Sequence, residues 1–312
     1  MVARRAGSLP RLWARDPDVV AVINQHHQNP LFLPGVILDP AITATTDMAF
    51  ATEGADAALL VVPAQFLRSV IQVLGCHLRR GIPLLLCAKG IETSSLKLMS
   101  EVAAEILPAA PSAVLSGPTF AAEVARELPT AVTIASSDAS LGRAFMEALG
   151  SSRFRPYLSQ DPVGAEIGGA VKNVLAIACG IVVGNSLGDN ARASLITRGL
   201  AEMIRLGVAK GGRAETFRGL SGLGDLVLTC SSAQSRNYGL GLALGRGLTV
   251  EAALRGSRSV VEGVATAASV ARLAARLAIE MPIGAGVDAL LHGGQSVSAV
   301  IDLLLRRPYR AE

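Results

Sequence analysis

The sequence predicts an α/β protein with a parallel β-sheet in its first half and helices alone in its second half. Across residues 1–158, short apolar runs alternate with helical patterns, which is typical of parallel strands joined by crossover helices. From residue 159 onward the apolar residues follow helical spacing, and no alternating segment interrupts them. We therefore expect two domains, residues 1–158 and 159–312, each long enough to bury its own core.

The expected elements follow from this alternation. Strands are expected at 11–14, 42–45, 57–62, 84–88, 113–115, 131–135 and 154–157. Helices are expected between most of them, for example over 65–79 and 94–107. Strands and helices in this order form a doubly wound, Rossmann-like sheet, the type that binds dinucleotides. In the second domain, helices are expected over 163–183, 191–209, 235–244, 260–277, 282–291 and 296–304.

The phosphate-binding fingerprint of such a sheet is missing from its usual position. Gly-x-Gly-x-x-Gly should lie between the first strand and the first helix. The chain instead opens with basic residues that end at Gly7, which resembles the last turn of a helix and its C′ glycine. Residues 11–14 then correspond to the second strand of the usual sheet. We expect an N-terminally truncated domain that lacks the first strand and the glycine loop and has an impaired cofactor site.

The end of the strand at residues 11–14 bears on the choice of cofactor. In a doubly wound sheet this strand end meets the adenosine ribose. Arg15 could pair with a 2′-phosphate and favours NADP, whereas Asp16 keeps NAD open. A solvated arginine at the end of a strand explains Arg15 equally well.

Composition excludes several classes of function. Half of the residues are hydrophobic, yet no run reaches the roughly 18 uncharged apolar residues of a membrane span. The net charge of +4 is dispersed and 4% of residues are aromatic, so no nucleic-acid partner is expected. Four scattered cysteines indicate reduced thiols in the cytoplasm and no zinc site. The histidines lack metal-ligand spacing, so no metal is expected.

Lys172 is the strongest candidate for chemistry. It lies inside a long apolar helix, and it is one of only four lysines among 29 basic residues. Burial disfavours the ammonium form, so the pKa of Lys172 should fall toward the range useful for proton transfer. Gly168 and Gly169, one turn earlier, leave space through which the side chain could reach a small ligand. A lysine that snorkels from a helix edge is the structural alternative.

Other polar residues occupy positions where ligands bind. Lys89 follows an apolar strand, at the edge where open α/β sheets bind ligands. Gly117 and Thr119 lie in a turn after another strand, where backbone amides can hold an anion. Asp225 ends a glycine-rich turn and could pair with an ammonium group, although a helix-capping role explains it too. Residues 234–237 start a helix with Ser235, Arg236 and Asn237, a suitable phosphate seat, although a helix-capping serine and a surface arginine explain them equally well.

Nine segments, in this order along the chain, resemble the bacterial NAD(P)-dependent glycerol-3-phosphate dehydrogenases. They are LWARDP (12–17), NPLFLPG (29–35), AKGIE (88–92), SGPTFA (116–121), GGAVKNV (168–174), ITRGLAE (196–202), GLGDL (222–226), QSRN (234–237) and VVEG (260–263). The resemblance implies reversible hydride transfer between NAD or NADP and C2 of sn-glycerol 3-phosphate or dihydroxyacetone phosphate. The reaction would supply glycerol phosphate for phospholipid biosynthesis. The partner is then a small phosphorylated triose or glycerol, with a homodimer left open.

The resemblance also implies roles for individual residues. Lys172 matches the proton acceptor in alcohol oxidation. The residues implied to contact substrate are Lys89, Gly117, Thr119, Lys172, Asp225, Ser235, Arg236 and Asn237. The residues implied to line the cofactor site are Arg15, Lys89, Ala121, Arg236, Val260 and Glu262. We expect Lys89 and Arg236 to complement the phosphate charge and Asp225 to hold Lys172 in place.

Two alternatives remain open at this stage. One is a related β-hydroxyacid-type dehydrogenase with the same two domains and a lysine acid/base, because Arg236 favours a phosphate over a carboxylate only weakly. The other is a cofactor-impaired remnant that acts as a binding protein through its helical domain.

Overall fold

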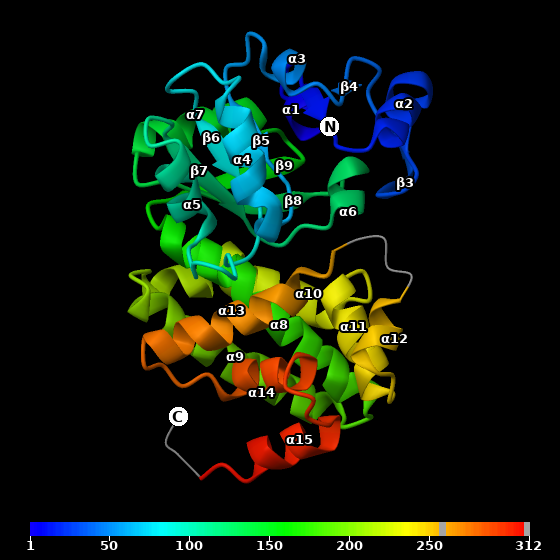
Figure 1. The fold of residues 1–312 in the computed structure, drawn as a ribbon, viewed down its shortest axis with the longest axis vertical. Coiled ribbons are helices and arrows are strands. Elements are labelled where there is room, and N and C mark those ends of the chain that lie inside the picture. The colour runs from blue at the N-terminus through cyan, green and yellow to red at the C-terminus, as the bar shows by residue number, and fades with distance from the viewer. Residues whose placement is uncertain (256–259, 309–312) are drawn as a thin grey trace. The chain divides into compact units, whose positions relative to one another are not determined.

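The computed structural model describes residues 1–255 and 260–308 and divides into two compact units. The first, here the sheet unit, comprises Met1–Val62, Phe66–Ala88 and Met99–Pro162. The second, here the helical unit, comprises Pro63–Gln65, Lys89–Leu98 and Val163–Glu312. Two short segments from the first half of the sequence, one of which carries Lys89, therefore belong to the helical unit. Figure 1 traces the chain and labels its elements.

The larger sheet of the sheet unit has five strands in sequence order. They are β5 (Ala58–Leu60), β6 (Leu84–Leu86), β7 (Ser112–Ser116), β8 (Thr130–Ala135) and β9 (Phe154–Ser159). β5, β6 and β7 are mutually parallel and β8 is parallel to β9, but β7 and β8 are antiparallel. The expectation of a wholly parallel sheet was therefore wrong at one pair. The connection from β7 to β8 contains only the five-residue helix α6 (Ala121–Ala125), too short to cross the sheet.

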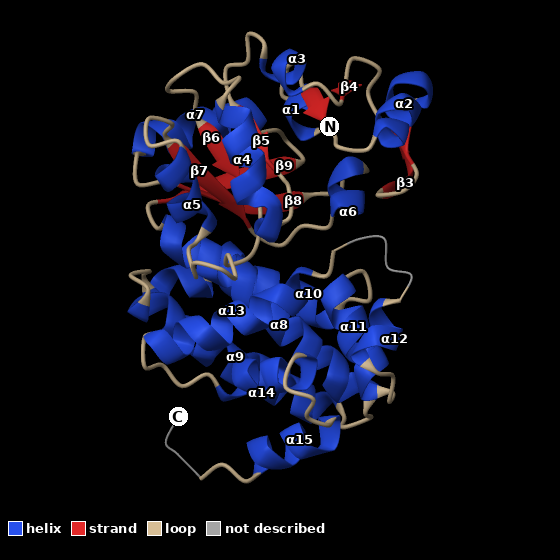
Figure 2. Ribbon diagram, viewed as in Figure 1, coloured by secondary structure: helices blue, strands red, loops and turns tan. Residues whose placement is uncertain are grey.

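The remaining strands form two small sheets. β1 (Arg11–Trp13) pairs in parallel with β4 (Thr43–Thr45), and both correspond to strands expected from the sequence. β2 (Gln28–Asn29) and β3 (Leu33–Ile37) form an antiparallel hairpin that the sequence did not predict. Among the described residues, no strand joins β1 to β5. Figure 2 shows these strands within the sheet unit.

The helices of the sheet unit pack on its apolar strands. They are α1 (Val2–Arg5), α2 (Pro17–His26), α3 (Met48–Thr52), α4 (Leu67–Gly75), α5 (Met99–Ile106), α6 and α7 (Ala139–Leu149). The 3₁₀ turn η1 (Ala64–Phe66) spans the boundary, since Ala64 and Gln65 belong to the helical unit and Phe66 to the sheet unit. The helical opening of the chain is confirmed, since Gly7 follows α1 with a φ of +96°. Gly7 adopts this φ without the steric cost that a Cβ would bring.

The helical unit contains ten helical segments within its described residues. They are α8 (Pro162–Gly184), α9 (Asp189–Ala209), the 3₁₀ turn η2 (Ala214–Arg218), the π-helical turn η3 (Leu220–Gly224), α10 (Asp225–Ser231), α11 (Arg236–Gly245), α12 (Val250–Leu254), α13 (Glu262–Arg276), α14 (Pro282–Leu291) and α15 (Val297–Leu305). All six helices expected in this half are present, with ends shifted by at most two residues. The expected helical character of this half is confirmed.

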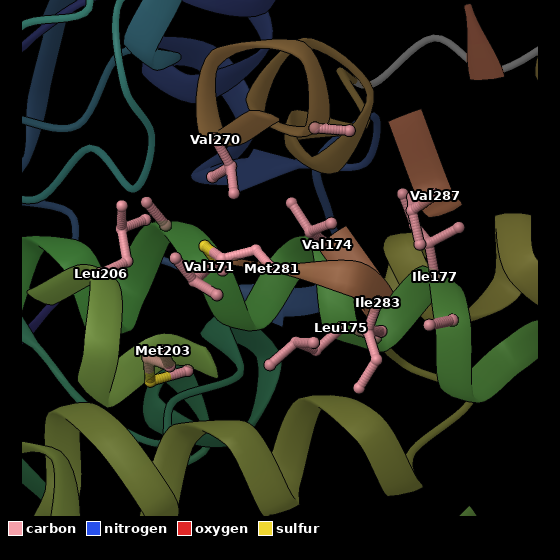
Figure 3. Close-up of a cluster of buried hydrophobic side chains, with 14 of the residues drawn as sticks. Val171, Val174, Leu175, Ile177, Met203, Leu206, Val270, Met281, Ile283 and Val287 are labelled. Carbon is pink, nitrogen blue, oxygen red and sulfur yellow. The ribbon is translucent and has the colours of Figure 1, made fainter. Parts of the chain in front are cut away.

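Helix α8 forms the centre of the helical unit. Every residue from Gly164 to Val182 is buried, so the helix is enclosed on all sides. It is the one helix among the described residues that is long and apolar enough to cross a membrane, and its burial identifies it as a core helix. Figure 3 shows Val171, Val174, Leu175 and Ile177 of α8 among side chains from α9, α13 and α14.

Glycines bring the backbones of α8 and α11 into direct contact. A Cβ at Gly241 of α11 would lie 2.8 Å from the carbonyl carbon of Ile177 and 3.0 Å from the Cα of Gly180. Gly184 and Gly245 meet in the same way further along the two helices. This close approach fixes α11, the helix that begins at the predicted phosphate seat, against the helix that carries Lys172.

Candidate active site

Two lysines share one buried carboxylate in the helical unit. Asp225 is the first residue of α10 and is completely buried. Lys172 Nζ donates to Asp225 Oδ1 at 2.5 Å, and Lys89 Nζ donates to Asp225 Oδ2 at 2.7 Å. The side chain of Lys172 is 8% exposed and that of Lys89 is 19% exposed. Lys172 therefore does not snorkel to solvent.

The environment of Lys172 suits proton transfer near neutral pH. Its pKa falls from 10.5 to about 8, chiefly because burial removes the hydration of the ammonium group. The charge of Lys89 lowers the pKa further, and the carboxylate of Asp225 opposes both effects. The predicted fall in the pKa of Lys172 is thus reproduced with its expected cause.

Thr229 is a member of this cluster that the sequence analysis missed. Its Oγ1 accepts a hydrogen bond from Lys172 Nζ at 2.9 Å and donates one to Asp225 Oδ1 at 3.3 Å. The residue is buried and lies one turn after Asp225 on α10. That i, i+4 spacing from an aspartate at the start of a helix was the available signal.

Asparagines link three helices to the backbone of Lys89. Asn173 of α8 accepts a hydrogen bond from Asn237 Nδ2 at 2.9 Å and lies 3.4 Å from the carbonyl oxygen of Lys89. Asn237 Oδ1 in turn accepts from the backbone N–H of Gly263, at the start of α13. Ser235 caps α11 by accepting from the N–H of Tyr238, which matches the capping alternative for this serine.

A second polar group of the helical unit surrounds Glu262. Its Oε1 accepts from the backbone N–H of Ala64 at 3.1 Å. Its Oε2 is buried and has no hydrogen-bond partner among the described residues, and burial raises the pKa of this carboxyl group. Arg236 donates to the carbonyl oxygen of Val260 at 2.7 Å. A buried acceptor without a partner suits a ligand that brings a hydroxyl or amide donor, as a dinucleotide does.

Four predicted site residues belong to the sheet unit. Arg15 is exposed just after β1. Gly117 follows β7 with a φ of +142°, and a Cβ there would lie 3.0 Å from the Cα of Val132, so only glycine fits. Thr119 donates to the carbonyl oxygen of Gly117, and Ala121 begins α6. Asp16, the alternative ribose ligand, instead caps α2 by accepting from the N–H of Asp18.

One inference about the glycines before Lys172 was wrong. Gly168 was expected to leave room for a ligand, but a Cβ there would collide with the carbonyl oxygen of Ser221. The backbone of η3 occupies this space, and the Lys172 side chain contacts Asp225. Within the described residues, no group of three His, Cys, Asp or Glu side chains could hold a metal ion.

A doubly wound sheet unit, a helical unit and a buried lysine of lowered pKa define the class of nicotinamide-dependent dehydrogenases. Two family sequence profiles match the chain: "NAD-dependent glycerol-3-phosphate dehydrogenase N-terminus" over residues 1–142 and "NAD-dependent glycerol-3-phosphate dehydrogenase C-terminus" over residues 161–302. The chain belongs to this family. It is an oxidoreductase that uses NAD(P) as its hydride carrier, and the resemblance found in the sequence is confirmed.

Individual relatives agree with this membership. The glycerol-3-phosphate dehydrogenase [NAD(P)+] of Rhodospirillum rubrum is 58% identical over 310 residues, which cover 99% of this chain and 89% of the relative. That of Caulobacter vibrioides is 57% identical and covers 100% of this chain and 94% of the relative. The crystal structure of the Coxiella burnetii enzyme superposes with a TM-score of 0.94 at 40% identity, covering 98% of this chain and 94% of that one. Glycerol-3-phosphate dehydrogenase activity, expected from the sequence, is confirmed.

Proposed function

We propose that Lys172 is the proton acceptor when the enzyme oxidises sn-glycerol 3-phosphate to dihydroxyacetone phosphate. Hydride can leave C2 only as the C2 hydroxyl loses its proton, and an amine with a pKa of about 8 takes that proton near neutral pH. Bound NAD(P) supplies the hydride acceptor. In the reverse direction the Lys172 ammonium returns the proton to the carbonyl oxygen. The single observation that supports this role most strongly is the buried contact of Lys172 with Asp225.

The other roles follow from charge and hydrogen bonding. Asp225 orients Lys172, and Lys89 brings a second positive charge close to it. We assign Lys89 and Arg236 to the phosphate end of the substrate, because guanidinium and ammonium groups pair well with phosphate oxygens. Further substrate contacts are proposed for Gly117, Thr119, Ser235 and Asn237.

The cofactor is assigned to a second set of residues. Arg15, Lys89, Ala121, Arg236, Val260 and Glu262 are proposed to line its site. The buried, unpartnered Oε2 of Glu262 is the feature that best suits a bound dinucleotide. Arg15 is exposed and free to meet a 2′-phosphate, so we propose a preference for NADP over NAD. We propose residues 1–158 as the dinucleotide-binding domain and residues 159–312 as the substrate and catalytic domain, with Lys89, Gly117 and Thr119 of the first range as additional substrate contacts.

The N-terminal truncation expected from the sequence is not supported, because the family profile for the N-terminus matches from residue 1. We propose that these 312 residues bind the dinucleotide only weakly. No Gly-x-Gly-x-x-Gly occurs in the sequence, and in the described residues β1 and β5 are not joined through a strand between them. In the usual 3-2-1-4-5-6 order, a strand at this position is central and carries the phosphate loop. Titration of NADPH into the purified chain tests this. Binding at micromolar concentration would disprove it, whereas a grafted N-terminal strand and glycine loop should tighten weak binding.

The cellular setting is proposed from the chemistry. The enzyme's product, glycerol 3-phosphate, supplies phospholipid biosynthesis. The four free cysteines suit the reducing cytoplasm. We propose a homodimer, for which the exposed Leu303 and Leu305 of α15 offer apolar surface. Sedimentation velocity tests the dimer, and a monomer at micromolar concentration would exclude it.

The catalytic proposal is tested by replacing Lys172 with methionine, which keeps the length of the side chain but has no amine. NADPH oxidation with dihydroxyacetone phosphate should lose on the order of 100-fold or more in kcat, in the 312-residue chain and in the grafted chain. Lys210→Met is the matched control, since Lys210 ends α9. Activity of Lys172→Met within a few-fold of wild type would exclude the role. No turnover by either wild-type chain would favour the binding-protein alternative.

A further inference from the structure

Within the helical unit, the backbone of α8 closely contacts the segment that leads into Asp225, the shared carboxylate. Gly168 precedes Lys172 by one turn on α8, so both residues lie on the same face of that helix. A Cβ at Gly168 would collide with the carbonyl oxygen of Ser221, and it would lie 3.1 Å from the carbonyl carbon of Ser221. Ser221 belongs to η3, the π-helical turn that runs directly into Asp225. The backbone of α8 therefore touches the segment that presents the carboxylate.

A second close backbone contact of η3 involves η2. A Cβ at Gly222 would overlap the backbone of Phe217 in η2. The ring of Phe217 is completely buried and fills the space that a side chain at Gly207 of α9 would need. Ser221 itself is 1% exposed. The π-helical turn thus contacts the backbones of both α8 and η2, and it cannot move toward either without displacing a packed backbone.

We propose that Gly168 is a positioning residue: its lack of a side chain lets η3 lie against α8, and this contact holds the Asp225 carboxylate between the two lysine ammonium groups. The proposal rests on the proposed role of Lys172. π-helical turns occur mostly as single turns inside helices, frequently at functional sites. Here the turn sets the start of α10 so that Oδ1 of Asp225 meets Lys172 and Oδ2 meets Lys89.

The geometry makes this position sensitive. Both contacts of Asp225 lie within 2.7 Å, and Thr229 on the same helix contacts Lys172 at 2.9 Å. A Cβ at Gly168 would push η3 and the start of α10 away from α8, and both acceptors would move with them. A misplacement of about 1 Å at a catalytic group can cost on the order of 100-fold in rate.

The Gly168→Ala variant tests the proposal through the ionisation of Lys172. The titratable groups close to Lys172 in space are Lys89, which precedes α8 in the chain, Asp225 and Cys230 of α10, and Cys179 of α8 itself. Asp225 is the one whose charge raises the pKa of Lys172. Moving the carboxylate away should therefore lower the pKa of Lys172 from its value of about 8 and reduce kcat by on the order of 100-fold.

The measurement is a ¹³C NMR titration of the lysine Cε carbons, which needs no enzyme activity. Only four lysines occur in the chain, so each resonance can be assigned with one Lys→Met variant. Gly239→Ala on α11 is the matched control, because a Cβ there meets no atom within 4 Å. We expect the pKa of Lys172 to fall by at least about half a unit in Gly168→Ala and to stay unchanged in Gly239→Ala.

Each outcome decides the proposal. A lowered pKa of Lys172 in a folded Gly168→Ala protein, judged by its far-ultraviolet circular dichroism, supports it. A folded variant with an unmoved Lys172 titration overturns it, and so does a variant that does not fold, because the contact then serves stability alone. If Lys172 titrates near pH 8 in the wild-type chain but the chain turns over no substrate, the proposed function fails while the positioning role stands.

Discussion

Thr229 and Lys172 form a hydrogen bond that couples the Lys172 amine to helix α10, with 2.9 Å between Oγ1 and Nζ. Both residues are buried, so this hydrogen bond is shielded from bulk solvent. The same hydroxyl donates to Asp225 Oδ1, and it thereby joins the carboxylate to the amine. Thr229 orients Lys172 alongside Asp225.

Replacing Thr229 with valine should therefore slow catalysis without unfolding the protein. Valine keeps the shape of threonine but removes the hydroxyl, and a lost hydrogen bond to a charged group costs about 1.5–3 kcal/mol. We expect kcat for dihydroxyacetone phosphate reduction to fall by about 10- to 100-fold, with KM for the substrate nearly unchanged. Thr229→Ser keeps the hydroxyl and should stay close to wild type. Equal rates for the valine and serine variants would contradict the coupling.

The pH dependence of the two reaction directions should be opposite in sign. Alcohol oxidation needs Lys172 unprotonated, and the unprotonated fraction grows as pH rises through its pKa of about 8. Ketone reduction needs the ammonium form, which is present below that pKa and is lost above it. We expect kcat/KM for glycerol 3-phosphate to rise, and kcat/KM for dihydroxyacetone phosphate to fall, across an ionisation near pH 8. Steady-state rates from pH 6 to 10 measure both.

The outcome that would contradict this assignment is equally specific. Lys210→Met should keep both profiles, since Lys210 ends α9 and takes no part in the proposed chemistry. A profile that keeps its ionisation near pH 8 in Lys172→Met would assign that ionisation to another group.

Gly117 should resist substitution because of its backbone conformation. Its φ of +142° is rarely adopted by residues with a Cβ, and a Cβ there would lie 3.0 Å from the Cα of Val132. We expect Gly117→Ala to lower the free energy of unfolding by about 1–3 kcal/mol, measured by urea denaturation. Gly142→Ala in α7 is the matched control, since its Cβ would make only an ordinary contact at 3.5 Å. Equal stability of the two variants would show that the turn relaxes.

Local patterns in the sequence sufficed for the long elements. The all-apolar run at Leu84–Leu86 predicted a buried strand, and the unbroken apolar helix around Lys172 predicted α8 to within one residue at each end. Helix α2 was missed although Asp16 and Pro17 supply an N-cap and an N1 proline. The β2–β3 hairpin was missed because the prolines and glycine between residues 30 and 35 resemble a loop.

Features set by contacts between distant residues could not be predicted in this way. The antiparallel pairing of β7 with β8 depends on which strand edges meet, which no local pattern records. At the site, the sequence suggested that Asp225 holds Lys172, and that pair is in contact. Lys89 shares the same carboxylate, and Gly168 faces Ser221 instead of a ligand. Both features depend on the π-helical turn η3. Nothing in residues 220–224 alone distinguishes such a turn from an α-helical one.

The contact between α8 and α11 should tolerate no added side-chain atom without loss of stability. A Cβ at Gly241 would lie 2.8 Å from the carbonyl carbon of Ile177, and neither helix backbone can yield by a rotamer change. We expect Gly241→Ala to lower the free energy of unfolding by about 2 kcal/mol or more in urea denaturation followed by circular dichroism.

The control for Gly241→Ala lies on the same helix. Gly239→Ala meets no atom within 4 Å and should stabilise α11 by about 0.5–1 kcal/mol, because alanine loses less conformational entropy than glycine. The two variants make the same chemical change two residues apart, so a difference between them reports the contact with α8 alone. Since α11 also carries Arg236 and Asn237, Gly241→Ala should raise KM for glycerol 3-phosphate as well. A Gly241→Ala protein as stable as Gly239→Ala would show that the two helices separate without cost.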